Sequence, residues 1–486
     1  MKRAIGSALS WMAVFVLLLA ACAPAATPTP TPTAAPPPTP APSPTPAPSP
    51  TPAPVEISIT CRCVKGGVNA NTVKWLTETV IPAFEKQMAE KGTPVRVRLV
   101  EFGGSDEELK AQYALDLKAG KGHDVMAFDG FWTAEFVAGG LIKPLEEIAG
   151  PEVNQWEGWS HIPQTVQALL MYQGKRYGIP TGTDVRVIWY RKDLFKQAGL
   201  PENWQPTSWE DIFAAARQIK KALPGVTPMQ VNAGTAMGEA TTMQGFYPVL
   251  LSAGSFIYDW DKNKWIVRSP AMLDALNFYK RVYIDEKLGD ARLQLIKEGR
   301  NQSFAMFRDG KIAMLWEGDY FWRSVLNPAA KSEWAIPNRD EVVGWAKIPA
   351  KEPGKGYRGQ DFVTISGGTG FILNPNTKHP KEAWAFLSFM FSKEMLMEFQ
   401  KIEPRIRARD DVPVTGDPVM TELVKLLPLT TVRPMLPVYP KVSQAAQLAT
   451  ERVVSGEMTP ERAMDAYARE VTDLVGPDNV LDLMPR

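Results

Sequence analysis

The chain contains few residues of the kinds that usually carry metal or redox chemistry. Among its 486 residues are three cysteines and three histidines. Acidic and basic residues nearly balance, at 53 and 54, so bulk charge gives no reason to expect a nucleic acid or an anionic membrane surface as partner. Beyond the N-terminal segment, no uncharged apolar run reaches the roughly 18 to 20 residues that cross a bilayer.

The common catalytic signatures are also missing. The sequence has no HExxH zinc helix, no GxSxG nucleophile turn, no GxxxxGK phosphate loop and no CxxC pair. Asp259, Asp261 and Asn263 have the opening spacing of a calcium loop, but Lys264 stands where that loop needs glycine. We therefore expect no enzymatic activity, no metal and no cofactor.

Cys61 and Cys63 are the only cysteines beyond the N-terminal segment. In a regular strand their Cα atoms would lie nearly 7 Å apart, about the limit for a disulfide, so a local bridge would require a distorted strand end. A Cys-x-Cys metal site lacks obvious companions among His123, His161 and His379. Two small buried thiols are the favoured interpretation.

The N-terminus carries a distinctive targeting pattern. Lys2 and Arg3 precede the apolar stretch 11–20, and small residues lead to Cys22. This pattern resembles the bacterial lipobox. The resemblance implies that residues 1–21 are removed as a signal peptide and that Cys22 becomes the lipidated N-terminus. The mature protein would then lie outside the cytoplasm, anchored to a membrane without spanning it.

A proline-rich tether follows the lipidated cysteine over residues 22–54. From Pro24 to Pro54, 15 of 31 residues are proline, interleaved with Thr, Ser and Ala. Such a composition cannot build a packed core and favours extended polyproline II, which at about 3.1 Å per residue reaches roughly 90 Å. We expect a semi-rigid spacer.

The remaining 55–486 segment is too long for one hydrophobic core and suits two lobes. Its first part alternates strands with helices, in the order Val55 to Thr60, Thr72 to Met88, Val95 to Val100, Asp106 to Ala119 with Ser105 as N-cap, and Val125 to Phe128. This βαβαβ pattern predicts an α/β fold with a mostly parallel sheet, whose ligands collect at the carboxyl ends of strands.

A second alternation of strands and helices begins after residue 180. The expected elements are Val185 to Tyr190, Trp209 to Leu223 with Ser208 as cap, Pro228 to Asn232, Thr241 to Ala253, a hairpin over Phe256 to Val267, Met272 to Tyr283 and Ile312 to Leu315. A late strand from Thr369 to Leu373, a helix from Pro380 to Phe391 and a mainly helical tail from Lys441 complete the pattern.

Tryptophan is the strongest chemical signal, with 15 in the chain. A pyranose presents an apolar C–H face that stacks on indole, while its hydroxyls require charged or amide partners. Trp132 lies near Asp129, and Trp316 precedes Glu317 and Asp319, each at a predicted strand end. The competing interpretation is that most tryptophans pack in cores.

Several ordered segments resemble the extracellular family 1 solute-binding proteins of ABC importers, notably those that bind maltose and trehalose. These segments are Gly122 to Leu145, Tyr177 to Asp211, Gly310 to Trp316 and Gly370 to Leu387. The resemblance implies a two-lobe, periplasmic-binding-protein-like (type II) fold, with hinge-connected lobes and a ligand cleft between them. The first lobe would comprise 55–180 and 342–395, and the second 181–341 and 396–486. The chain would cross between them near 179–184, 342–349 and 391–400.

The same resemblance implies where a sugar would bind. The implied contacts are Asp129, Trp132, Asp184, Trp316, Glu317, Asp319 and Gly368, with Lys65 and Asn69 as weaker candidates. The family often carries a Pro-x-Arg element near its end, from which this chain departs, so either Arg407 or Arg409 is expected to reach the ligand.

We therefore expect a monomeric, lipid-anchored receptor that captures a mono- or oligosaccharide and delivers it to a two-subunit permease driven by a cytoplasmic ATPase. One alternative is a different solute on the same scaffold, such as a glycerophosphodiester, polyamine or peptide; Arg62, Lys65, Arg186 and Arg407 would serve a phosphate. Another is a secreted glycoside hydrolase, which needs two carboxylates about 5 to 9.5 Å apart. Asp129, Glu317 and Asp319 are the candidates for that pair.

Overall fold

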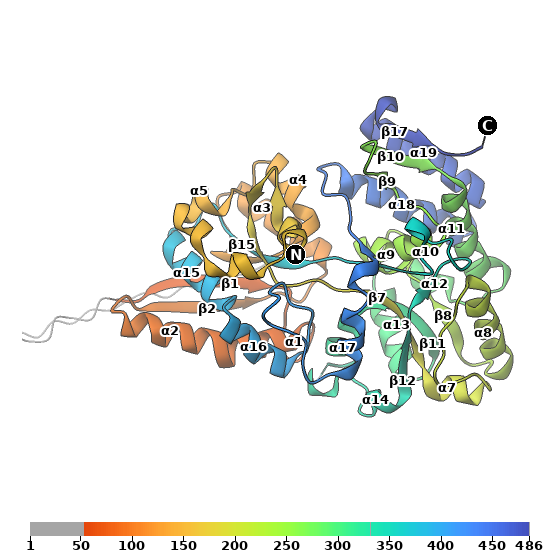
Figure 1. The fold of residues 1–486 in the computed structure, drawn as a ribbon, viewed down its shortest axis with the longest axis horizontal. Helices are drawn as coiled ribbons and strands as arrows, with labels where there is room; N and C mark the ends of the chain where they lie inside the picture. The colour runs from red at the N-terminus through yellow and green to blue at the C-terminus, as the bar shows by residue number, and fades with distance from the viewer. Residues whose placement is uncertain (1–52, 331, 486) are drawn as a thin grey trace, which may run out of the picture. The chain divides into compact units, whose positions relative to one another are not determined.

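The computed structural model describes residues 53–330 and 332–485. The predicted signal peptide, Cys22 and nearly all of the tether lie outside these residues. Within the described part, helices cover the faces of two principal sheets (Figure 1). The α/β prediction is confirmed, but the expectation of a mostly parallel sheet is wrong, because both principal sheets mix parallel and antiparallel strands. None of the helices in the described ranges combines the length and the apolar character that crossing a bilayer requires.

The first sheet has five strands in the order β2-β1-β3-β15-β6. Their bounds are Val95–Glu101, Val55–Cys61, Val125–Asp129, Thr369–Leu373 and Gly178–Pro180. β1 runs parallel to β2 and β3, whereas β15 runs antiparallel to β3 and β6. The late strand thus returns to a sheet otherwise built by the first part of the chain.

Alternate residues of these strands fill two separate cores. Val125 and Leu373 pack on one face with helices α1 (Ala70–Trp75), α2 (Ile81–Glu90), α15 (Pro380–Met390) and α16 (Lys393–Ile402). Met126 and Ile372 pack on the other face with α3 (Asp106–Lys118) and α4 (Thr133–Ala138). The period of two expected for strands therefore accounts for the layered arrangement.

The second sheet has four strands in the order β12-β7-β11-β8. Their bounds are Val343–Ala346, Arg186–Arg191, Ile312–Gly318 and Thr227–Gln230. β7 is antiparallel to β11 and β12, and β11 is parallel to β8. Every residue of β7 and β11 is buried, as expected for central strands covered on both faces.

Helices again cover both sides of the second sheet. The larger core includes α8 (Trp209–Ala222), α10 (Tyr247–Ser252), α11 (Pro270–Lys280), α18 (Tyr439–Val454) and α19 (Pro460–Val475). The smaller core includes α13 (Gly299–Arg308) and α17 (Pro418–Val424).

Short elements complete the fold. The helices are α5 (Leu145–Ala149), α6 (Gln164–Gln167), α7 (Lys192–Gln197), α9 (Glu239–Thr241), α12 (Ala291–Gln294) and α14 (Arg339–Val342). The strands are β4 (Met171–Tyr172), β5 (Lys175–Arg176), β9 (Tyr258–Asp259), β10 (Lys264–Arg268), β13 (Ile348–Pro349), β14 (Phe362–Ile365), β16 (Thr430–Thr431) and β17 (Val480–Asp482).

The chain passes between the two sheets three times. The first crossing lies between β6 and β7, close to the expected 179–184. The second differs from the expected 342–349, because β12 pairs with β7 and residues of β13 and β14 pack in the larger core of the second sheet. The chain returns to the first sheet only at residues 366–368. The third crossing follows α16 and so comes later than the expected 391–400, because Leu396 and Phe399 still belong to the first sheet's core.

Local sequence explains where two helices begin. Ser105 accepts a hydrogen bond from the Glu108 N–H while the Glu108 side chain returns to the Ser105 N–H, and Ser208 and Asp211 make the same pair of contacts. Both predicted N-caps are confirmed. These reciprocal bonds satisfy amide groups that a helix start leaves unpaired. The single helix expected over 72–88 is instead α1 and α2 joined by a π-helical turn at Leu76–Val80.

Cys61 and Cys63 form a disulfide, which corrects the expectation of two thiols. β1 ends at Cys61 and the chain bends there, with the Cys63 N–H donating to the Cys61 carbonyl at 2.9 Å. The bend brings the two Cα atoms to 5.3 Å, well inside the separation of a regular strand. The distorted strand end that a bridge requires is present.

Removing this disulfide is expected to cost little stability. It closes a loop of three residues, for which chain entropy alone predicts no more than about 1.6 kcal/mol. The Cys61→Ser, Cys63→Ser double variant should therefore lower the free energy of unfolding by that amount or less in urea denaturation. A loss above about 3 kcal/mol would contradict this expectation.

Candidate ligand-binding site

A polar junction forms at Gly367, in the short segment between β14 and β15. The Gly367 N–H donates to Asp184 Oδ1 at 2.7 Å, and Arg186 pairs with the same carboxylate. A Cβ atom added at Gly367 would lie 3.4 Å from Asp184 Oδ1 and 3.5 Å from Nη2 of both Arg186 and Arg433. A carboxylate and two guanidinium groups thus converge where the chain has no side chain. We call this place the Gly367 junction.

Arg433 connects the junction to the carboxyl end of β3. Its Nη2 donates to Asp129 Oδ1 at 3.0 Å and its Nη1 to Glu239 Oε1 at 3.1 Å. The guanidinium group also lies 4.3 Å from the centre of the Phe131 ring. Phe131 is half-buried and contacts cores on both sheets. Asp129 and Phe131 therefore stand where elements of the two sheets meet.

Asp184 and the connected Asp129 differ in pKa. Burial raises the pKa of Asp129 to about 6, although Arg433 opposes the rise. Burial alone would also raise the pKa of Asp184, but the Arg186 guanidinium and the Gly367 N–H outweigh it and lower that pKa. Asp184 thus stays ionised at neutral pH, whereas Asp129 takes up its proton near pH 6.

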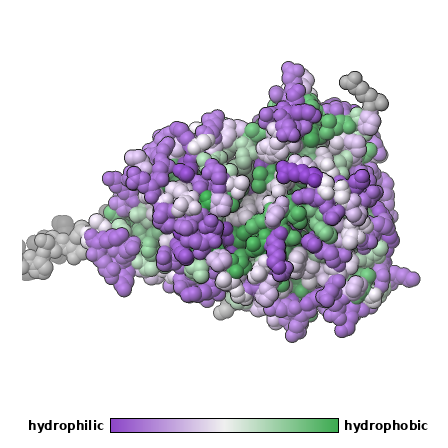
Figure 2. Space-filling model, viewed as in Figure 1, coloured by the Kyte–Doolittle hydropathy of each residue, from purple (hydrophilic) through white to green (hydrophobic). Residues whose placement is uncertain are grey.

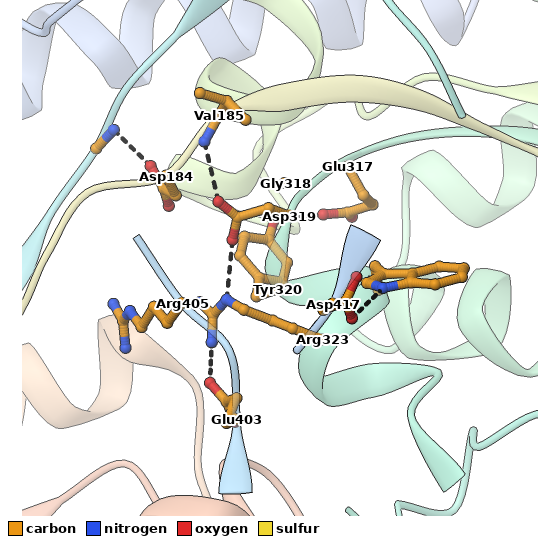
Figure 3. A network of polar contacts seen from close by, with 12 residues as sticks. Asp184, Val185, Glu317, Gly318, Asp319, Tyr320, Arg323, Glu403, Arg405 and Asp417 are labelled. Carbon is orange, nitrogen blue, oxygen red and sulfur yellow. Dashed lines mark hydrogen bonds and ion pairs between the residues drawn. The ribbon is translucent and has the colours of Figure 1, made fainter. Parts of the chain in front are cut away.

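A second, deeper set of contacts connects the first crossing with the third (Figure 3). Asp319, just past the end of β11, accepts from the Val185 N–H at 3.3 Å and from Arg323 Nε at 2.9 Å. Arg323 also pairs with Glu403, which accepts from Asn71 Nδ2 at 3.1 Å. We call Asp319, Arg323, Glu403 and Asn71 the crossing network. Because the Asp319 side chain is 0% exposed, it supports the junction and does not reach a solute in this conformation.

Glu317 is likewise enclosed. Its carboxylate is 0% exposed and accepts two hydrogen bonds from Arg300, both at 2.8 Å, and one from the Tyr320 hydroxyl. Arg300 and Tyr320 are only half-buried. A solute would therefore meet those two side chains before it met Glu317, which differs from the direct contact expected from the sequence.

Trp132 and Trp316 lie in separate hydrophobic interiors, which differs from the expected stacking surfaces. Trp132 is 2% exposed and packs edge-on against Phe128 and nearly parallel to Phe136. Trp316 is 0% exposed and packs near Phe278. Neither indole offers a face to a pyranose in this conformation. The aromatic ring that stands at the junction is Phe131.

Gly368 serves close packing. A Cβ atom there would lie 2.2 Å from Leu169 Cδ1 and 3.1 Å from the Gly182 carbonyl oxygen. Its own carbonyl accepts from the Gly130 N–H at 3.0 Å. The glycine that borders the polar junction is its neighbour, Gly367.

The loop after β1 leaves Lys65 and Asn69 exposed. The Lys65 backbone N–H donates to Glu101 at 2.7 Å, and Asn69 Nδ2 donates to the Arg62 carbonyl at 2.7 Å. Neither side chain touches the Gly367 junction, but Asn71, two residues on, belongs to the crossing network. The loop thus adjoins the candidate site without forming its centre.

The two candidate arginines of the third crossing are occupied inside the protein. Arg409 pairs with Glu157 and Asp411, and its side chain is 2% exposed. Arg407 donates to the Gln400 side chain at 3.0 Å and lies 4.1 Å from the centre of the Phe399 ring. Neither side chain is therefore placed to make the ligand contact that the resemblance implies for one of them.

Reading the sequence alone missed the residues that make the junction. Arg186 is two residues beyond Asp184, and the sequence indicates it only as a contact for a phosphate ligand. Arg433 has no local signal, since it meets Asp129 across 304 residues of chain. Phe131 adjoins the tryptophan that was chosen instead. The burial of Trp132 does have a signal in the sequence, because Phe128 and Phe136 stand four residues before and after it.

His161, Asp410 and Asp411 form a group at the protein surface whose ligand atoms lie within 4.8 Å of one another. Asp411 accepts two hydrogen bonds from Arg409, and Lys393 approaches it at 3.8 Å. These cations already balance the carboxylate. We assign no metal to this group.

Comparison with protein families matches residues 69–397 to those described as bacterial extracellular solute-binding protein. A protein of Brucella abortus (strain 2308), whose name says only that it is a binding protein, is 25% identical over 398 residues. The matched region covers 81% of this chain and 88% of that protein.

Two solved structures share the fold. A solute-binding protein of an ABC transporter from Thermotoga lettingae TMO, bound with alpha-D-tagatose, has a TM-score of 0.71 at 23% identity. A maltose-bound protein of T. maritima has a TM-score of 0.71 at 21% identity. Each comparison covers 87% of this chain and 100% of the other. The predicted two-lobe fold is confirmed.

Proposed function

This chain belongs to the bacterial extracellular solute-binding proteins, and on that premise we propose that it captures a carbohydrate and delivers it to the permease of an ABC importer. As a member of an extracellular family, it acts outside the cytoplasm and binds a small solute. That the solute is a sugar, and that it is delivered to a permease, are the proposed parts of this function. They are supported by the chemistry of the Gly367 junction and by the sugars named for the two structural neighbours.

The alternation of carboxylates and guanidinium groups carries the proposal. A sugar hydroxyl both donates and accepts, so vicinal hydroxyls match Asp129 and Asp184 as acceptors and Arg186 and Arg433 as donors. The side chains of Asp129 and Asp184 are 23% and 15% exposed, which leaves each an accessible edge. Phe131 supplies an aromatic surface beside them.

Contacts between helices and loops that surround the two sheets support capture by hinge closure. Arg433 reaches Asp129, the Glu239 N–H donates to Glu107 at 3.0 Å, and Lys297 Nζ donates to Glu108 at 2.6 Å. We take the two lobes to be the bodies built on the two sheets, with the three crossings as hinge. A solute stabilises the closed form only by its differential affinity for that form.

Calorimetric titration with a panel of mono- and oligosaccharides tests the proposal. At least one sugar should bind with a stoichiometry near one, and Asp184→Asn should weaken that binding. Folded protein that binds no sugar in the panel but binds a polyamine or peptide would overturn it.

Affinity should depend on pH through Asp129. Above pH about 6 its carboxylate is ionised and accepts hydrogen bonds from hydroxyls; below that pH it is protonated. If only the ionised form binds, affinity falls roughly tenfold between pH 7 and pH 5. The Asp129→Asn variant should bind more weakly at pH 7 and lose this step. A step of unchanged size in the variant would assign the titration to another group.

The alternatives that the sequence left open fit the site less well. Arg186 and Arg433 are each paired with carboxylates, so neither guanidinium is free to neutralise a phosphate dianion. A glycosidase needs a carboxylic acid that reaches the glycosidic oxygen. Glu317 and Asp319 are 0% exposed and held by Arg300 and Arg323.

We further propose that Cys22 is lipidated after removal of residues 1–21, with the proline-rich segment as spacer. Replacing Cys22 by serine should block processing at this position, so that the retained precursor carries no acyl chain. Metabolic labelling with a radioactive fatty acid should label the natural protein and leave the variant unlabelled. Equal labelling of both would contradict this assignment.

A further inference from the structure

Two arginines of the third crossing have no acidic partner. Among the described residues, neither Arg405 nor Arg407 takes part in an ion pair, and Arg405 Nε and Arg407 Nη1 are buried without a hydrogen-bond partner. A buried guanidinium without a counter-charge is costly. Both arginines therefore call for a physical explanation.

The nearby carboxylates are already engaged by other donors. Asp184 is held by Arg186 and the Gly367 N–H, Asp319 by Arg323 and the Val185 N–H, and Glu403 by Arg323 and Asn71. Four guanidinium groups, those of Arg186, Arg323, Arg405 and Arg407, face these three carboxylates. None of these three carboxylates forms an ion pair with Arg405 or Arg407.

Arg405 is the member that a solute can reach. Its side chain is half-buried, and its Nη2 donates only a long hydrogen bond of 3.4 Å, to Thr369. Thr369 is exposed and lies opposite Asp129 in the register of β15 and β3. Figure 3 shows the Arg405 guanidinium without a dashed line to any labelled carboxylate. Arg407, by contrast, is enclosed by Phe399 and Gln400.

The electrostatics agree with this geometry. Burial lowers the pKa of Arg405 to about 10, and the neighbouring Arg323 adds to the effect. The group stays cationic at neutral pH, at a cost that an incoming anion would remove. A guanidinium binds a carboxylate by two parallel hydrogen bonds, which also fixes its orientation.

We propose that Arg405 binds the carboxylate of an acidic sugar whose hydroxyls occupy the Gly367 junction. This inference rests on the proposed function and narrows its substrate class to uronic acids. A monoanion fits better than a phosphate dianion, because Asp184, Asp319 and Glu403 all lie close enough to influence the Arg405 charge.

Matched pairs of probes test the inference by calorimetry at pH 7. Galactose and galacturonate, glucose and glucuronate, and the 6-phosphates of both sugars are titrated into the natural protein, Arg405→Gln and Arg462→Gln. Arg462 is exposed on α19, so its variant controls for the loss of one positive charge. We expect one acid to bind roughly tenfold to hundredfold more tightly than its neutral partner. Arg405→Gln should abolish that preference, whereas Arg462→Gln should retain it.

Stability provides an independent readout. Arg405→Gln removes a half-buried cation that has no acidic partner, so its unfolding midpoint should equal or exceed that of the natural protein. Equal binding of a neutral sugar and its acid, tighter binding of a sugar phosphate, or a preference that survives Arg405→Gln would overturn the inference while leaving sugar capture intact. Binding of peptides or polyamines, and of no sugar of either charge, would instead overturn the proposed function.

Discussion

Replacing Gly367 by glutamine is expected to abolish solute binding while the protein still folds. The new side chain would extend from a point 3.5 Å from the Nη2 atoms of Arg186 and Arg433, and would take the hydrogen bonds that we assign to sugar hydroxyls. Losing two such bonds in a buried site weakens binding on the order of 100-fold or more. Titration with the best ligand of the sugar panel measures the effect.

Two substitutions serve as graded controls. Gly367→Ala adds a methyl group at ordinary contact distances and should reduce affinity only slightly. Gly368→Ala should act on stability, because its Cβ would collide with Leu169 and approach the Gly182 carbonyl. If Gly367→Gln bound the sugar as tightly as the natural protein, the solute site would lie elsewhere.

Replacing Arg323 by methionine should cause the largest loss of stability. Arg323 is the cation between Asp319 and Glu403, whose side chains are 0% and 4% exposed. Without it, both buried carboxylates lose their ion-pair partner, a change that typically costs about 3–5 kcal/mol. Glu403 lies in the third crossing and Asp319 contacts the first, so the substitution should weaken the connection between these crossings. The loss is measured as a lower free energy of unfolding in urea.

A surface ion pair provides the matched control for Arg323. Lys425 pairs with Glu422 at the end of α17, and both side chains are more than half exposed. Lys425→Met should change stability by less than about 0.5 kcal/mol. A loss below about 1 kcal/mol in Arg323→Met would show that the crossing network does not hold the crossings together.

The sequence predicted the alternation of strands and helices well because that information is local. The β15 bounds, Thr369–Leu373, and the caps at Ser105 and Ser208 follow from residues a few positions apart. The second crossing was misplaced because Val343–Ala346 is a short edge strand, and only its pairing with β7 assigns it to the second sheet.

The site was harder to predict because its partners are distant in the chain. Position at a strand end indicates Asp129 and the family resemblance implies Asp184, and the structure connects both to the Gly367 junction. Trp316 was misread because β11 is buried on both faces, so a large side chain at its end faces a core. Arg433 could be found only from contacts between residues far apart in sequence.

A crystal structure with the tightest-binding sugar of the panel tests the central claim most directly. The account predicts sugar density beside Gly367, with hydroxyls within hydrogen-bond distance of Asp129, Asp184, Arg186 or Arg433 and with Phe131 beside the ring. Sugar density away from these residues, with the Gly367 junction unchanged, would contradict it.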